Sequence, residues 1–122
     1  MLVDTCSLFD FMSQRNEFER VESLLKESRA AISVISIYEL FRGVESDKHI
    51  EQRHHLVGLC KVLDLTGSIC LKSSQLYTDL KKKGQLISNQ DILIAATALH
   101  WKYPLLTSNR SDFERISRVD LF

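Results

Sequence analysis

The chain has 122 residues, of which 44% are hydrophobic and 26% charged, and 16 basic residues balance 16 acidic ones. This length allows one core and is too short for two ordinary domains, so we expect a single domain over residues 1–122. The composition excludes an intrinsically disordered chain. A net charge of zero counts mildly against a nucleic-acid partner held by charge alone, although four acids committed to a metal would leave a net positive surface.

Several features of the sequence indicate the compartment. No apolar stretch approaches the length needed to cross a bilayer, and the chain does not begin with a basic segment followed by an apolar one. Cys6, Cys60 and Cys70 are odd in number and lack C-x-x-C spacing, so they are expected to be free thiols. We therefore expect a cytoplasmic protein with no membrane partner and no zinc site.

The first half of the chain alternates predicted strands and helices. Met1–Val3 is a short apolar run before an acid, which predicts a buried strand. Apolar residues at 18, 21, 24 and 25 then predict a helix in a charged segment. Ala31–Ile35 is rich in β-branched residues and predicts a second strand. Ser36 follows, and apolar residues at 37, 40, 41 and 44 predict an amphipathic helix.

The second half continues the same alternation. Helices are predicted over 47–60, over 69–83, where three lysines and Gly84 mark the end, and over 89–99. Strands are predicted at 62–65, 104–107 and, as an edge strand, 118–121, with a short helical turn at 112–116. Strands that alternate with helices imply a parallel sheet with helices on its faces, so the sequence predicts an α/β fold with three α/β/α layers and four to five strands.

Four acids fall where such a fold binds ligands, beyond the carboxyl ends of the strands. Asp4 ends the first strand, and Glu39 and Asp91 are expected in the first turns of two helices. Asp112 lies just past the strand at 104–107. Clustered carboxylates repel one another and need a cation, and a set of oxygen ligands favours Mg²⁺ or Mn²⁺. Phosphodiester hydrolysis is the natural reaction for such a site.

Each acid also has a purely structural interpretation. Ser36 and Glu39 form a capping-box pattern, in which Glu39 would only bond to the Ser36 amide. Asn89 could cap the helix that carries Asp91, and Asn109 or Ser111 could cap the turn that carries Asp112. Asp4 is harder to explain this way, because an acid at the end of a buried strand is costly without a partner. The four acids together at one edge favour a functional site.

With these residues identified, the chain resembles the PIN-domain ribonucleases, and among them the VapC toxins of toxin–antitoxin pairs. The resemblance covers essentially the whole chain through four segments in order. These are Leu2–Cys6, Ile35–Leu40 with Gly43, Gly84 with Asp91–Ala98, and Leu106–Phe113. The third segment is the most specific match.

The resemblance implies an endoribonuclease that depends on Mg²⁺ or Mn²⁺. Asp4, Glu39 and Asp91 would be its acidic site residues, with Asp4 and Asp91 as the metal ligands. Thr107 would orient the site by hydrogen bonds. Many members carry a fourth acid where this chain has Asn109, so either Asn109 or Asp112 fills that position. The resemblance also implies an RNA substrate, a cognate antitoxin that binds across the groove, and a homodimer.

Three alternatives remain open. A receiver-like phosphoacceptor module also gathers acids at strand ends, but it needs an acid pair after the first strand, where this chain has Thr5 and Cys6. A haloacid-dehalogenase-type phosphatase would need an acid in place of Cys6. A PIN-like module that binds RNA or a partner without cleavage would keep the fold and lose the chemistry.

Overall fold

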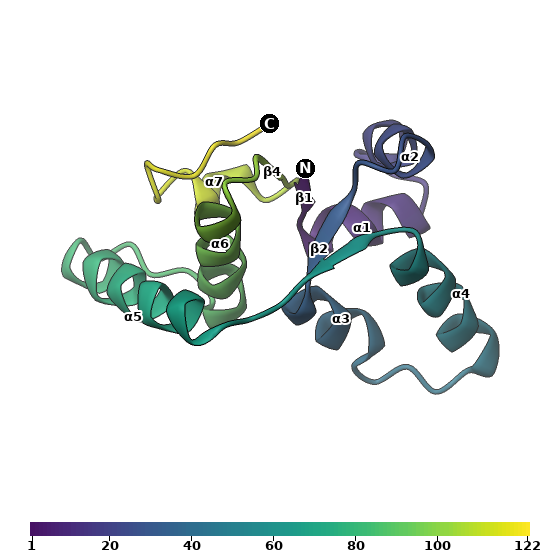
Figure 1. Cartoon of the computed structure of the whole chain (residues 1–122), viewed down its shortest axis with the longest axis horizontal. Coiled ribbons are helices and arrows are strands. Elements are labelled where there is room, and N and C mark those ends of the chain that lie inside the picture. The colour runs from purple at the N-terminus through teal and green to yellow at the C-terminus, as the bar shows by residue number, and fades with distance from the viewer.

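Four short parallel strands form the centre of the structure, a computed structural model that describes residues 1–122 (Figure 1). They are β1 (Leu2–Val3), β2 (Ala31–Ser33), β3 (Lys61–Leu63) and β4 (Leu105–Leu106). Their order across the sheet is β3-β2-β1-β4, and every neighbouring pair is parallel. The predicted edge strand at 118–121 is reduced to one parallel bridge between Leu105 and Leu121.

Seven helices connect and cover these strands. They are α1 (Thr5–Met12), α2 (Phe18–Lys26), α3 (Val34–Phe41), α4 (Asp47–Gly58), α5 (Gly67–Lys82), α6 (Asn89–Trp101) and α7 (Arg110–Phe113). Figure 1 shows α5 and α6 on one side of the strands and α1, α2 and α4 on the other. No helix has both the length and the apolar character that crossing a membrane would require.

The strands alternate their side chains between two separate cores. Leu2 and Leu105 pack into a core shared with α5, α6 and α7, whereas their chain neighbours Val3 and Leu106 pack into a core shared with α1 to α4. Successive side chains of a strand point to opposite faces, so a strand of two apolar residues contributes to both cores. The predicted three-layer α/β/α architecture is confirmed.

Several predicted boundaries are wrong by a few residues, and one helix was missed. The second strand ends at Ser33, two residues early, and the turn at 112–116 is α7, which begins at Arg110. Helix α1 was not predicted. It begins directly after Asp4, whose side chain accepts a hydrogen bond from the Thr5 amide and thereby caps the helix.

Two predicted helix caps are also wrong. Ser33, not Ser36, caps α3, so Glu39 lies in the second turn of that helix. Ser88, not Asn89, caps α6 by accepting a hydrogen bond from the Asp91 amide. In both cases the true cap is the last residue that remains in extended conformation.

The strand order places the first strand of the chain at the centre of the sheet. The chain leaves β1 to build β2 and β3 on one side and returns to build β4 on the other. In open parallel sheets, ligands bind outside the carboxyl ends of the strands where the winding direction reverses. Here that point lies between the ends of β1 and β4, where Asp4 and Thr107 follow the two strands.

Candidate active site

Asp4 lies at the centre of the candidate site and is almost fully buried, with 3% of its surface exposed. The Thr5 amide donates to Oδ1 at 2.8 Å, and the Thr107 hydroxyl donates to Oδ2 at 2.8 Å. The Cys6 thiol donates to the same Oδ2 at 3.0 Å. Burial raises the pKa of Asp4 and the three donors oppose that rise. Such donors hold the carboxylate in one orientation.

Cys6 takes part in this arrangement as a thiol. Burial and the charge of Asp4 raise the pKa of its side chain, which keeps the proton on sulfur. Its Sγ also lies 3.3 Å from the Thr107 hydroxyl. A nucleophilic cysteine needs a lowered pKa, so Cys6 is a donor to Asp4 rather than a nucleophile.

Asp91 is placed by the first turn of α6 and is half-buried. Burial and the charge of Asp4 raise its pKa to about 6. The bond with Ser88 opposes that rise, and the charges of Glu39 and Asp112 add to it. The three other predicted acids therefore all act on Asp91, although the four come from widely separated segments of the chain. The structure brings all four predicted acids to one edge of the sheet.

Glu39 is held by a contact that the capping-box interpretation did not anticipate. Its Oε1 accepts a hydrogen bond of 2.9 Å from the hydroxyl of Thr5, at the start of α1. Ser36, which was expected to bond with Glu39, is fully buried inside α3, and its Oγ lies 2.9 Å from the same Thr5 hydroxyl. The capping-box interpretation is therefore wrong, because α3 begins one turn earlier.

Asn109 and Asp112, the two candidates for the fourth position, are hydrogen-bonded to each other. The side-chain amide of Asn109 donates to Asp112 Oδ2 at 2.9 Å and to Asp91 Oδ2 at 3.5 Å. Asp112 also lies 4.0 Å from the Arg115 guanidinium. Asn109 therefore links the two acids and does not cap α7 with its side chain.

The site carries more negative charge than its surroundings balance. None of the five salt bridges of the chain involves Asp4, Glu39 or Asp91. No three carboxylate, imidazole or thiol groups are close enough to hold an ion by themselves. Mg²⁺ commonly binds through one or two carboxylates, with water and substrate phosphate as its other ligands. The pair Asp4 and Asp91 fits this requirement, since the charge of Asp4 already raises the pKa of Asp91.

Sequence reasoning did not assign Thr5 to this arrangement and gave Ser36 only a capping role. Thr5 was considered only as a neighbour of Asp4 in the sequence, although its amide bonds with Asp4 and its hydroxyl with Glu39. The available signal was the adjacency of a β-branched hydroxyl to the first acid. Thr107 was expected to orient the site, and its hydroxyl is indeed bonded to Asp4.

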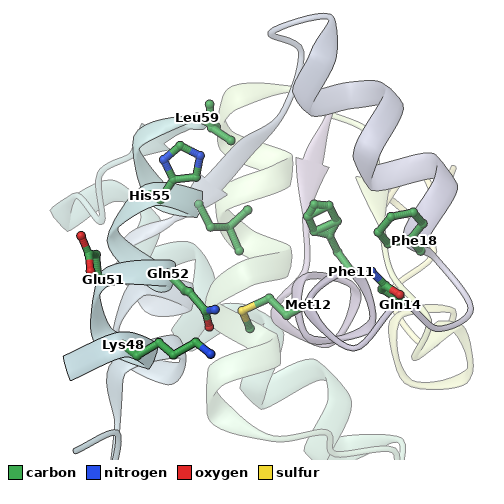
Figure 2. A pocket seen from close by; sticks show the side chains of 10 residues that line it. Phe11, Met12, Gln14, Phe18, Lys48, Glu51, Gln52, His55 and Leu59 are labelled. Carbon is green, nitrogen blue, oxygen red and sulfur yellow. The ribbon is translucent and has the colours of Figure 1, made fainter. Parts of the chain in front are cut away.

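A separate cavity of about 660 Å³, lined by hydrophobic and polar residues in equal number, lies between α1, α2 and α4 (Figure 2). Phe11 and Phe18 stack on one side of it with their ring centroids 5.3 Å apart. On the other side, Lys48 and Gln52 of α4 extend toward Met12 (Figure 2). Leu59, which also lines the cavity, is 46% exposed. None of the four predicted acids lines this cavity.

Comparison with known proteins agrees with this fold. A family model described as the PIN domain matches residues 1–119. Ribonuclease VapC1 of Methanocaldococcus jannaschii is 36% identical over 121 residues, which cover 99% of this chain and 84% of that protein. The solved structure of VapBC-1 from nontypeable Haemophilus influenzae has a TM-score of 0.83 at 29% identity and covers 99% of this chain and 95% of that one. A toxin–antitoxin complex from Klebsiella pneumoniae has a TM-score of 0.75 at 26% identity, with coverage of 97% and 93%.

Proposed function

The chain belongs to the PIN-domain family, and from this we propose that it is a metal-dependent endoribonuclease, the toxin of a VapBC-type toxin–antitoxin pair. The observation that carries the proposal is the raised pKa of Asp91, about 6, at a half-buried position where Asp4, Glu39 and Asp112 add their charges. Clustered acids without a balancing cation favour a divalent ion. The VapC1 ribonuclease relative supports the reaction.

The roles of the residues follow from their positions. Asp4 and Asp91 would hold Mg²⁺ or Mn²⁺, and a bound ion of this kind activates water and stabilises charge on the leaving oxygen. The Thr5 amide, Thr107 and Cys6 hold Asp4 in one orientation. Glu39 would orient the attacking water through its carboxylate. Asp112, held by Asn109, contributes negative charge near Asp91.

The proposal is tested by incubating purified protein with structured and single-stranded RNA in Mg²⁺, in Mn²⁺ and in EDTA. We expect cleavage with either metal and none with EDTA, and the Asp4→Asn variant serves as a control for contaminating nuclease. Cleavage at an undiminished rate in EDTA would refute the metal mechanism. Tight RNA binding without cleavage in either metal would favour the alternative of a PIN-like binding module.

We infer that the antitoxin binds at least in part through the cavity between α1, α2 and α4. Its lining combines stacked Phe11 and Phe18 with the exposed Leu59, which suits a segment that presents apolar side chains. The resemblance to a solved toxin–antitoxin complex supports such a partner. A Leu59→Asp variant should lose antitoxin binding in calorimetry and keep its RNA cleavage. Unchanged affinity would place the partner elsewhere.

We also propose that the chain forms a homodimer. Sedimentation equilibrium of the protein alone measures this directly. A mass of about 14.1 kDa at all concentrations would contradict it, since that is the mass of one chain.

A further inference from the structure

We propose that Thr5 is a positioning residue that fixes Glu39 relative to Asp4, and that Ser36 sets the direction of its hydroxyl. The inference rests on the proposed function, because it assigns Thr5 a part in the same site. It is carried by three hydrogen bonds that meet at one residue. The Thr5 amide donates to Asp4 Oδ1, its hydroxyl donates to Glu39 Oε1, and the same hydroxyl lies 2.9 Å from Ser36 Oγ.

Proton accounting gives this network a single direction. A threonine hydroxyl has one proton, and an ionised carboxylate can only accept. The proton of Thr5 is therefore committed to Glu39, 2.9 Å away. Ser36 must then donate its own proton to Thr5, because no other partner of its hydroxyl is present. The direction is from Ser36 to Thr5 to Glu39.

Burial makes this direction stable. Thr5 is 4% exposed and Ser36 is fully buried, so water does not compete for either hydroxyl. Each residue belongs to a different helix, Thr5 to α1 and Ser36 to α3. A buried hydroxyl left without a hydrogen-bond partner is costly. The Thr5 and Ser36 side chains therefore both favour the conformations in which their hydroxyls bond to each other.

Glu39 depends on this contact more than the other acids depend on theirs. Asp4 has three donors, but the hydroxyl of Thr5 is the one hydrogen-bond donor to Glu39, and no salt bridge holds it. A glutamate has three side-chain torsions and turns readily toward solvent when it is not held. Thr5 thus connects the acid at the end of β1 with the acid on α3, and catalysis requires such groups to be held in place.

The central experiment is a double-mutant cycle between Thr5→Val and Glu39→Gln. Valine keeps the shape of threonine and removes the hydroxyl. We expect Thr5→Val to lower kcat at saturating metal by about tenfold or more, because the loss of one modest interaction in the transition state slows a reaction by about that factor. In the Glu39→Gln background, Thr5→Val should lower kcat by less than about twofold, because the Thr5 hydroxyl acts through the charge of Glu39. Additive losses would overturn the proposal.

Two variants separate positioning from packing. Thr5→Ser keeps the hydroxyl and should restore most of the activity that Thr5→Val loses. Thr97→Val is the matched control, because Thr97 is also a buried threonine, but its hydroxyl donates to the Leu93 carbonyl of its own helix. It should retain wild-type kcat. A Thr5→Ser variant as slow as Thr5→Val would contradict the proposal.

A measurement without RNA distinguishes a failure of this inference from a failure of the proposed function. The ¹³C signal of the Glu39 carboxyl in the metal-free protein should move in Thr5→Val and stay in place in Thr97→Val. Should Thr5→Val fail to fold, Ser36→Ala removes the first bond of the network and should move the same signal by a smaller amount. An unmoved Glu39 signal in every folded variant would overturn the positioning role, whereas failure of the wild type to cut RNA would overturn only the proposed function.

Discussion

The hydroxyl of Thr107 donates a hydrogen bond of 2.8 Å to Asp4 Oδ2 across a sequence separation of 103 residues. The Thr107 hydroxyl oxygen in turn accepts a hydrogen bond of 2.9 Å from the backbone amide of Asn109. The Asn109 contact fixes the rotation of the hydroxyl, so its proton is directed at Asp4. The two residues follow β1 and β4, the adjacent strands at which the winding of the sheet reverses.

Replacing Thr107 by valine should therefore affect both stability and activity. Asp4 would lose one of three donors, and the Asn109 amide would lose its acceptor. A hydrogen bond to a charged group contributes about 1.5 to 3 kcal/mol, so we expect a destabilisation of that order, measured by urea unfolding. RNA cleavage should fall about tenfold or more. Thr107→Ser keeps the hydroxyl, and a large defect in that variant would assign the effect to the lost methyl group.

Asp4→Asn and Asp91→Asn should each abolish metal-dependent RNA cleavage while the protein stays folded. Their stabilities should differ. Asp91→Asn removes repulsion from three other acids and should melt higher than wild type without metal. Asp4→Asn leaves one acceptor oxygen for three donors, so its melting temperature should not rise above that of the wild type. Circular dichroism on heating compares the variants, and normal cleavage by either would refute the site.

The stability of the metal-free protein should fall as the pH rises from about 4 to about 7. The pKa of Asp91 is about 6 in the folded chain against an ordinary value of 3.8, so between these two values the folded state holds the proton while the unfolded state releases it. Stability decreases with pH wherever the folded state binds more protons. Thermal melts in EDTA test this, and Asp91→Asn should flatten the curve.

Addition of Mg²⁺ or Mn²⁺ should raise the melting temperature at neutral pH, because an ion that binds only the folded state stabilises it by mass action. The increase should shrink in Asp4→Asn. Zn²⁺ should not be needed for activity, because no group of histidine, cysteine and acidic side chains is placed to hold it. An equal increase in wild type and variant would show that the ion binds elsewhere.

Glu39→Gln should melt close to wild type and cut RNA at least about tenfold more slowly, which corresponds to about 1.4 kcal/mol of transition-state stabilisation. Glutamine keeps an oxygen that accepts from Thr5 but loses the charge that would orient water. Because Glu39 is not part of a helix cap, the substitution has little reason to destabilise α3. A variant that cuts normally would remove Glu39 from the mechanism and leave the site to Asp4 and Asp91.

The grouping of the acids could be predicted from the sequence because each lies just past a predicted strand or early in a predicted helix, and a parallel sheet brings the carboxyl ends of its strands together. Asp4 was recognised because it follows a run that had to be buried. The parallel sheet with helices on both faces was likewise predictable from the alternation of strands and helices, and the resemblance identified it as PIN-like. The short lengths of β1 and β4, two residues each, did not obscure it, because Met1 and Pro104 extend each apolar run by one residue.

The helix starts and the hydroxyl network could not be predicted. Ser33 and Ser36 are separated by nearly one helical turn, so the apolar periodicity that follows is compatible with a cap at either serine. Only the extended backbone conformation of Ser33 identifies it as the cap. Helix α1 lacks a charged face, and its cap is the very acid assigned to the metal. The contact between Thr5 and Glu39 joins residues 34 apart and depends on how α1 packs beside α3, which no local pattern records.

The placement of β1 between β2 and β4 has a consequence for the synthesis of the chain. The ribosome produces β1 first, but the strand acquires its second neighbour only when Leu105 and Leu106 have emerged. Asp91 and Thr107 are also made late, so a nascent chain that carries Asp4 and Glu39 has no complete site. Pairing between the ends of a chain is a late event in folding. Translation thus has to pass Thr107, 103 residues after Asp4, before a site able to attack RNA can form.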